Sequence, residues 1–423
     1  MIEIIPHKMK PHCEVTVPGS KSFTHRILIA SALSDGICSV ENALLSEDTV
    51  LTMKALRQMG IRIEENTGDR LIIYGANGIL QPSREPIYLG NSGTSIRLLT
   101  AISALGKDTY TLMGNDRMAE RPIQALLDAL GQIGVQARST HGNGCPPLEV
   151  NGKNLSGTNV TISCRESSQY LTGLLLMAPC TKGGLKISVI QGPVSRPYVD
   201  MTIDVMARFG IAIDRQGYDG FQVTGNQAYR SGDYEVEADA SQAGYFWAAA
   251  AICQKAVKVK GVSQDSCQGD VNFSKVLESM GCAVKNEPDG ITVSGHDRLR
   301  AVEIDMGDMP DIVPTLAVVA AFAEGTTVIK NVSHLKSKES DRLTSVVNEL
   351  IKMGITARCS DDELMVAGGH PRGAEIETYG DHRIAMSFAV AGLAAPGTMI
   401  RDEHCVEKSF PNYWQVFEGM NER

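Results

Sequence analysis

One short phrase recurs at nearly constant spacing along this chain and limits the folds that it can adopt. Each copy is a stretch with the period of an amphipathic helix, then an apolar residue, a glycine and a short apolar run. The glycine suits the left-handed residue that often ends a helix before a strand begins. The glycines, 71 to 76 residues apart, are Gly60, Gly134, Gly210, Gly281 and Gly354. This regularity predicts repeated structural units.

A second landmark lies ahead of each such helix, where a small polar cluster opens an apolar stretch long enough for another helix. The six clusters begin 70 to 76 residues apart, at Ser20, Asn91, Ser167, Ser241, Asp311 and Asp381. The chain therefore predicts six repeats that alternate helices and strands. Because 423 residues exceed one ordinary core, we expect an α/β fold with two similar domains, each of three βαβαββ-type units.

The polar clusters also indicate chemistry. Ser, Asn or Asp at a helix start commonly caps the free backbone N–H groups, and this explains any single cluster. Six such clusters at regular spacing indicate anion binding in addition to capping, because helix starts also bind anions and three of the clusters add Lys or Arg. If three units form each domain, the helix starts can converge on an interdomain cleft, where we expect an active site for anionic substrates.

Composition excludes several classes of partner. The formal net charge of −9 disfavours nucleic acid and membrane surfaces, since both demand a basic excess. The first residues lack the apolar core of a secretory signal, and the longest apolar run, 312–323, is too short to span a bilayer, so we expect a cytoplasmic protein. The ten cysteines form no Cys-x-x-Cys pair and no zinc-type cluster, so we expect free thiols, no metal and no cofactor.

Nine motifs, in one order along the chain, carry a specific resemblance. They occupy residues 18–26, 90–97, 117–122, 167–170, 195–198, 310–311, 338–343, 380–386 and 408–411. Together they resemble the signatures of the 5-enolpyruvylshikimate-3-phosphate synthases, a family of enolpyruvyl transferases, and the resemblance covers essentially the whole chain. It implies transfer of the enolpyruvyl group of phosphoenolpyruvate to the 5-hydroxyl of shikimate 3-phosphate, with release of phosphate. This is a step of the shikimate pathway to chorismate and aromatic amino acids.

The resemblance also implies where the domains divide. In that family the chain starts in one domain, crosses early to the other and returns. We therefore expect one domain at 20–236, with the shikimate 3-phosphate site and part of the phosphoenolpyruvate site. The other comprises 1–19 plus 237–423 and contributes the catalytic carboxylates and the rest of the phosphoenolpyruvate site. A monomer is expected.

Hydroxyl donors and cations near several helix starts are the residues that the resemblance assigns to shikimate 3-phosphate. Taken alone, the serines would be helix caps and the basic residues a solvated face. A planar guanidinium such as that of Arg26 suits the substrate carboxylate. The full implied set is Lys21, Ser22, Arg26, Ser167, Ser168, Gln169, Ser195, Tyr198, Asp311, His334 and Lys338.

Phosphoenolpyruvate carries about three negative charges, so its site needs several fixed cations to compete with its hydration. Gly93 lies where the backbone is expected to approach the ligand closely. The set that the resemblance implies is Lys21, Asn91, Gly93, Thr94, Arg121, Gln169, Glu339, Arg342, His382, Arg383 and Lys408.

Four of these residues are the implied catalytic groups. Asp311 would take the proton of the 5-hydroxyl, and Glu339 would give a proton to C3 and later retrieve it. Lys21 would stabilise the phosphate, and His382 would contact the phosphate or orient Glu339.

Two other functions compete. UDP-N-acetylglucosamine enolpyruvyl transferases share the expected fold, but they usually carry a cysteine on a mobile loop, and the matching stretch 114–121 has none. The second competing function is that of a non-catalytic binding protein of the same architecture. Such a protein has no need of the acid and base that this chain retains, which speaks against it. Gly93 further predicts inhibition by glyphosate, since some insensitive members of the family have alanine there.

Overall fold

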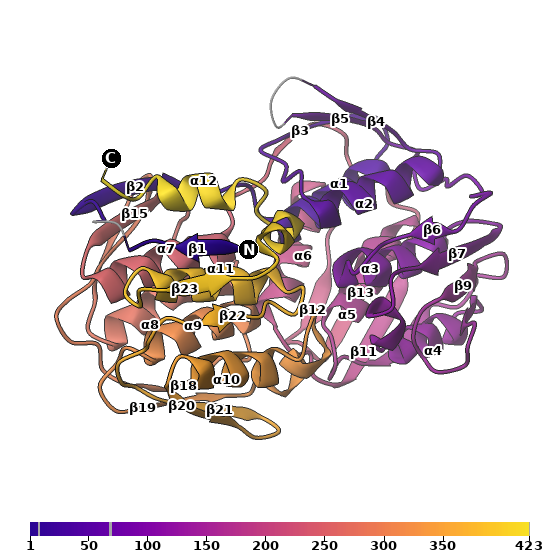
Figure 1. The fold of residues 1–423 in the computed structure, drawn as a ribbon. Helices are drawn as coiled ribbons and strands as arrows, with labels where there is room; N and C mark the ends of the chain where they lie inside the picture. Colours follow the sequence, from indigo (N-terminus) through magenta and orange to yellow (C-terminus); the bar gives the residue numbers. More distant parts are fainter. Residues whose placement is uncertain (7–8, 67–69, 423) are drawn as a thin grey trace. The chain divides into compact units, whose positions relative to one another are not determined.

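The computed structural model describes residues 1–6, 9–66 and 70–422, and these form two compact units. The middle unit is Gly19–Val236, and the split unit joins Met1–Pro18 to Glu237–Arg423. The strands of the described residues form six sheets, three in each unit (Figure 1). The predicted α/β fold of six repeats is therefore confirmed.

The second repeat of the middle unit shows the βαβαββ pattern most directly. β6 lies parallel to β7, which pairs antiparallel with β9, and β8 is the outer strand on β9. One helix follows β6 and another follows β7. The elements are β6 (Ile87–Tyr88), α3 (Gly93–Ser103), β7 (Thr109–Met113), α4 (Gln124–Gln132), β8 (Gln136–Ser139) and β9 (Leu148–Asn151).

The first repeat of the middle unit varies this pattern, and the third keeps it. The first takes its parallel partner strand from the end of the unit, where β14 pairs with β3. Its elements are α1 (Lys21–Ala32), β3 (Ile37–Glu41), α2 (Glu47–Gln58), β4 (Arg62–Glu65), β5 (Leu71–Tyr74) and β14 (Asp233–Glu235). The third has β10 (Asn159–Ser163), α5 (Gln169–Met177), β11 (Leu185–Gln191), α6 (Pro197–Arg208), β12 (Asp214–Gln216) and β13 (Gly220–Val223).

In the split unit, β2 of the first segment lies parallel to β15 of the second, which ties the two segments together. In the last sheet, β1 pairs antiparallel with β23 and β22 pairs parallel with it. Its elements are β1 (Ile2–Ile4), β2 (His12–Thr16), α7 (Ala240–Cys253), β15 (Ala256–Lys260), α8 (Phe273–Ser279), β16 (Ala283–Glu287), β17 (Gly290–Ser294), β18 (Glu303–Asp305), α9 (Val313–Ala320), β19 (Thr326–Lys330), α10 (Arg342–Lys352), β20 (Thr356–Cys359), β21 (Glu363–Ala367), β22 (Glu375–Ile376), α11 (His382–Gly392), β23 (Thr398–Ile400) and α12 (Tyr413–Glu418).

The first helix of each repeat is buried on nearly every side because it lies inside its unit. In the split unit, α7, α9 and α11 pack on one another, and in the middle unit α3 packs on α1 and α5. Trp247 of α7 is fully buried, and its Nε1 donates to the Ile291 carbonyl at 3.2 Å. Such helices have little polar surface except at their ends, and most of the predicted site residues lie near those ends.

The repeated glycines adopt the predicted left-handed conformation. Gly60, Gly134, Gly210, Gly281 and Gly354 have φ values from 81° to 111°. At Gly60 a side chain would also be obstructed, because a Cβ would lie 2.4 Å from Cγ of Gln81. The sequence phrase thus marks the end of the second helix of a repeat and the turn into its strand.

Within the described ranges, no helix has the length and apolar character needed to cross a membrane. The ten cysteines are free thiols, as predicted. Burial raises the pKa of Cys164 to about 12, so this thiol stays protonated at neutral pH.

Candidate active site

Polar side chains cap several of the buried helices, with differences from the predicted clusters. Ser20 accepts a backbone N–H in the first turn of α1, and Asp381 does the same for α11. In α7 the cap is Asp239, and Ser241 lies inside the helix. Asp311 lies in the short helix η4 (Pro310–Ile312), ahead of α9, where its carboxylate accepts from arginines.

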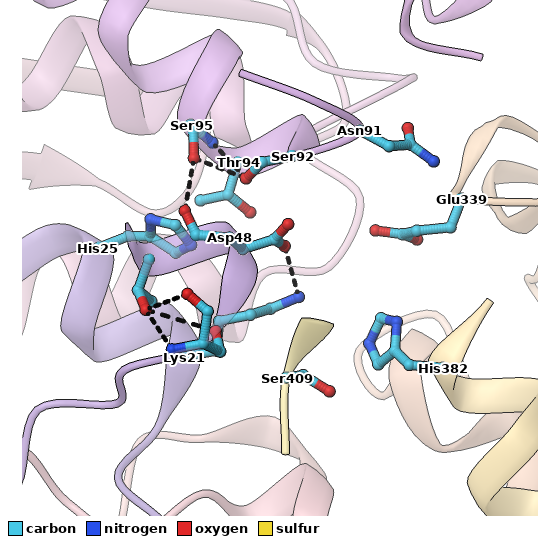
Figure 2. A network of polar contacts seen from close by, with 12 residues as sticks. Lys21, His25, Asp48, Asn91, Ser92, Thr94, Ser95, Glu339, His382 and Ser409 are labelled. Carbon is cyan, nitrogen blue, oxygen red and sulfur yellow. Dashed lines mark hydrogen bonds and ion pairs between the residues drawn. The ribbon is translucent and has the colours of Figure 1, made fainter. Parts of the chain in front are cut away.

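Lys21 is the first residue of α1 and is paired with an aspartate that the motifs did not single out. Its Nζ lies 3.1 Å from Oδ2 of Asp48, in the first turn of α2 (Figure 2). The Lys21 side chain is 9% exposed and that of Asp48 is 1% exposed. Because isolated buried charges are costly, Lys21 and Asp48 each provide the opposite charge that the other needs inside the protein.

A chain of hydroxyl groups links α1, α2 and α3 beside this pair. His25 Nδ1 lies 2.9 Å from Thr52 Oγ1, which lies 2.7 Å from Ser95 Oγ. Ser95 in turn lies 2.6 Å from Ser92 Oγ and donates to the Asp48 carbonyl at 3.3 Å (Figure 2). These buried bonds fix α1, α2 and α3 relative to one another.

Gln169 of α5 joins the third repeat of the middle unit to the second. Its Oε1 accepts from Arg97 Nη1 at 2.9 Å, and its Nε2 donates to Thr94 Oγ1 at 2.8 Å. Arg97 is 4% exposed and lies over the ring of Tyr170 at 5.6 Å. The amide of Gln169 is therefore oriented by groups on both of its sides.

Arg121 lies directly against the start of α3. Its Nη1 donates to the Asn91 carbonyl at 3.0 Å and to Asn91 Oδ1 at 3.1 Å. A Cβ on Gly93 would lie 2.3 Å from Arg121 Nη2 and 2.6 Å from its Cζ. A Cβ at position 93 would therefore displace the guanidinium, which lies at the far end of the Arg121 side chain.

Arg26 is a buried connector between helices of the middle unit. Its Nε donates to Thr202 Oγ1 at 2.9 Å and its Nη2 to the Tyr198 carbonyl at 2.9 Å. Ser167 Oγ accepts from the Gln169 N–H at 3.2 Å, and Ser195 has a left-handed φ of 55°. The other predicted residues of this unit lie near helix starts: Ser22 in α1, Ser168 before α5 and Tyr198 in α6.

In the split unit, Arg342 brings three carboxylates onto one guanidinium. Its Nη1 donates to Asp311 at 2.8 Å, its Nη2 to Glu339 at 2.9 Å and its Nε to Asp381 at 2.8 Å. The Arg342 side chain is 2% exposed. Burial alone would lower the pKa of Arg342, but Asp381, Glu339 and Asp311 outweigh burial and raise it. The guanidinium fork holds all three acids in fixed positions.

Asp311 has a second arginine partner. Nη2 of Arg383, in the first turn of α11, donates to Asp311 Oδ2 at 2.9 Å, and its Nη1 donates to the Tyr245 hydroxyl at 3.1 Å. Burial raises the pKa of Tyr245 to about 12, so its hydroxyl remains neutral. Each oxygen of the Asp311 carboxylate thus accepts from a different guanidinium.

The remaining predicted residues of the split unit are largely buried. His382, the first residue of α11, is fully buried, and Lys408, at the end of η6 (Glu403–Lys408), is 4% exposed. Lys338 follows η5 (Ser333–Ser337), which contains His334. Burial and the neighbouring Lys338 lower the pKa of His334 to about 3. At neutral pH, His334 therefore carries no charge.

The state of His334 has a consequence for stability. In the unfolded chain its imidazole gains a proton below about pH 6.5, whereas the folded protein resists this down to about pH 3. Stability from His334 is therefore present above pH 6.5 and is lost as pH falls. We expect the free energy of unfolding to fall by about 1 kcal/mol per pH unit between about pH 6 and 4 from this group. Urea unfolding of the parent and His334→Gln measures this effect. The free energy of unfolding of the parent should fall relative to that of the variant as pH falls, and parallel curves would contradict the expectation.

The structure brings the predicted residues together in two sets, one within each unit. Lys21, Asn91, Gly93, Thr94, Arg121 and Gln169 gather around the helix starts of the middle unit. Asp311, Glu339, Arg342 and Arg383 form one ion-pair cluster in the split unit. Sequence reasoning did not select Asp48, Thr52, Arg97, Tyr245 or Asp381 as site residues, although Arg97 and Asp381 stand inside recognised motifs.

Comparison with known proteins decides what this arrangement belongs to. The sequence model of the EPSP synthase (3-phosphoshikimate 1-carboxyvinyltransferase) family matches residues 8–417. The chain belongs to this family. The EPSP synthase of Acinetobacter baumannii has a similar structure, with a TM-score of 0.83 at 28% identity, covering 99% of this chain and 97% of that one.

Sequence relatives give the same result. The EPSP synthase family member from Syntrophobacter fumaroxidans, a 3-phosphoshikimate 1-carboxyvinyltransferase, is 43% identical over 409 residues, which cover 96% of each protein. The chloroplastic enzyme of Brassica napus is 42% identical over an alignment of 425 residues including gaps. The alignment covers 96% of this chain and 82% of that protein. The predicted family is confirmed, and so is the predicted activity: this chain is an enzyme of the shikimate pathway with 3-phosphoshikimate 1-carboxyvinyltransferase activity.

Proposed function

We propose that this chain binds phosphoenolpyruvate and shikimate 3-phosphate with the residues named from the motifs, and joins them through a tetrahedral intermediate. The observation that carries this proposal is the buried Arg342, which holds the proposed base Asp311 and the proposed acid Glu339 on one guanidinium. An addition and elimination needs an acid and a base in fixed relation, and this cluster supplies both. We further propose a cytoplasmic monomer that works without a metal or cofactor.

The proposed chemistry proceeds in two stages. In the addition, the 5-hydroxyl oxygen bonds to C2 of phosphoenolpyruvate and its proton passes to Asp311, while Glu339 gives a proton to C3. In the elimination, Glu339 takes a proton back from the new methyl group. The C2–O bond to phosphate then breaks, phosphate leaves with the bonding electrons, and it takes up the proton that the hydroxyl released.

The middle unit would bind the anionic groups. The charged Lys21, supported by Asp48, and Arg121, oriented by Asn91, suit the phosphate that develops charge as it leaves. Gln169 has an amide fixed by Arg97 and Thr94, which suits a group that bridges the two substrates. The buried serines Ser167, Ser168 and Ser195 suit the 3-phosphate of shikimate 3-phosphate, as their motifs predict.

A direct assay tests the proposal. Phosphate release from phosphoenolpyruvate is measured with shikimate 3-phosphate as acceptor and, in parallel, with UDP-N-acetylglucosamine. Release with the first acceptor alone supports the proposal. Release with the second acceptor alone, or binding of both ligands without release, would overturn it.

Gly93→Ala should weaken inhibition by glyphosate, which we propose competes with phosphoenolpyruvate. The added methyl would have to displace the Arg121 guanidinium, 2.3 Å away, and an inhibitor longer than phosphoenolpyruvate should lose more from that shift. We expect the inhibition constant to rise at least about tenfold, equivalent to roughly 1.4 kcal/mol, and the phosphoenolpyruvate KM to rise less.

Gly131→Ala is the matched control for this change. Gly131 lies in α4, and a Cβ there would meet no atom within 4 Å. It should leave both constants unchanged. Steady-state inhibition against varied phosphoenolpyruvate provides the measurement. A parent enzyme that ignores millimolar glyphosate, or a Gly93→Ala variant that matches the parent, would show that the steric argument is wrong.

A further inference from the structure

Asp270 is a buried carboxyl of the split unit that the proposed reaction does not use. It lies in η3 (Gly269–Asn272), just before α8, and is 3% exposed. Ser241 Oγ of α7 donates to its Oδ2. Its Oδ1 is buried and has no hydrogen-bond partner in the part of the chain that the structure describes. A carboxylate with so few donors in a buried site is costly to ionise.

Two of the charged groups that act on Asp270 belong to the active-site cluster, and a third is the cap of α7. Asp311 of η4 and Asp239, the cap of α7, are negative neighbours, and Arg383 of α11 is the positive one. Burial, then Asp311, raises the pKa of Asp270 to about 7, against the opposing effects of the Ser241 hydrogen bond and Arg383. Arg383 is the same side chain that donates to Asp311 at 2.9 Å. Asp270 and Asp311 therefore both interact with the positive charge of the Arg383 guanidinium.

We propose that Asp270 is a positioning residue whose protonated form leaves the positive charge of Arg383 to Asp311 and the anionic substrate. This inference rests on the proposed function, in which Arg383 binds phosphoenolpyruvate and Asp311 accepts the hydroxyl proton. When Asp270 gives up its proton to solvent, its new negative charge neutralises part of the Arg383 field. Phosphoenolpyruvate then binds more weakly, and the proton affinity of Asp311 rises.

The sign of the pH effect follows from these charges. Below neutrality Asp270 is neutral, and its replacement by asparagine changes little. As pH rises through about 7, the parent gains a buried negative charge that Asp270→Asn cannot acquire. The phosphoenolpyruvate KM of the parent should therefore rise relative to that of the variant. Ionisation of phosphoenolpyruvate itself affects both proteins equally and cancels in the ratio.

The test compares KM and kcat of the parent, Asp270→Asn and the exposed control Asp265→Asn between about pH 6 and 9. We expect parent and Asp270→Asn to agree within about twofold near pH 6, and the parent KM to be at least about threefold higher near pH 8.5. The control should follow the parent. The proposal would be overturned if KM of the parent and of Asp270→Asn depended on pH in the same way. It would also be overturned if Asp270→Asn lost activity equally at every pH.

Two further measurements apply even where Asp270→Asn folds poorly. Ser241→Ala removes a hydrogen bond that favours the ionised carboxylate, so it should shift the rise in KM to higher pH; an unshifted rise contradicts the proposal. Infrared spectroscopy of the parent should show a protonated carboxyl band that disappears as pH rises and that Ser241→Ala retains to higher pH. Absence of such a band contradicts the proposal. The band requires no activity, so failure of the proposed function remains distinguishable from failure of this inference.

Discussion

Glu339→Gln should lower turnover by about 100- to 10,000-fold while leaving the dissociation constants of both substrates nearly unchanged. Glu339 accepts a hydrogen bond from Arg342 Nη2 at 2.9 Å, and its side chain is 9% exposed. Glutamine has the same length and keeps an oxygen that can accept this bond. It cannot donate a proton to carbon and retrieve it. The substitution therefore removes the proposed proton transfer and preserves the geometry of the cluster.

Three measurements separate this role from a structural one. Turnover should fall together with hydrogen exchange into the methyl group, because both depend on the same proton transfer, while substrate binding persists. The matched control is Glu324→Gln, an exposed glutamate of the same unit that pairs with Arg298 at 3.8 Å, and it should behave like the parent. Turnover of Glu339→Gln within about threefold of the parent would rule out the role.

The fold could be predicted from the sequence because the repeat leaves a signal that does not depend on distant contacts. The helix-ending glycines need a left-handed backbone, and Gly60, Gly134, Gly210, Gly281 and Gly354 all have it. The exchange of strands between segments is harder to predict. β14 joins β3 and β2 joins β15 across about 190 and 240 residues of chain, and no local pattern encodes such a pairing.

The site could be predicted only where motifs marked it. Asp48 escaped selection because an aspartate in the first turn of a helix is usually a favourable surface residue. Its role depends on Lys21, which lies 27 positions earlier and 3.1 Å away. Tyr245 looked like ordinary core, since its hydroxyl acquires meaning only through Arg383, 138 positions later. The structure also shows that a Cβ at Gly93 would meet the Arg121 guanidinium, a contact between two motifs that the sequence could not reveal.

The ion-pair cluster costs free energy to bury and more to break. Burying several carboxylates with arginines does not by itself stabilise a fold, because desolvation offsets much of the attraction. Breaking the cluster, however, leaves uncompensated buried charge. Asp381 illustrates the double use of one group: it caps α11 through the Arg383 N–H at 2.9 Å and accepts from Arg342 Nε at 2.8 Å. The helix start and the arginine are therefore positioned together.

Arg342→Lys should destabilise the split unit by about 3 to 5 kcal/mol and lower turnover at least about 100-fold. Lysine keeps the charge, but its single ammonium cannot reach Asp311, Glu339 and Asp381 in the three directions that the guanidinium spans. At least one buried carboxylate loses its partner. The proposed acid and base are also no longer held in fixed relation, so turnover should fall even in the folded variant.

Denaturant unfolding and assays at a temperature where circular dichroism shows the variant to be folded distinguish these two effects. Arg358→Lys is the matched control, an exposed arginine of β20 in the same unit whose Nε lies 3.3 Å from Met365 Sδ. It should change stability by no more than about 0.5 kcal/mol, because it leaves no buried charge unpaired. An Arg342→Lys variant that matches this control in both stability and turnover would mean that a simple positive charge suffices. The three-way guanidinium geometry would then have no part in arranging the proposed acid and base.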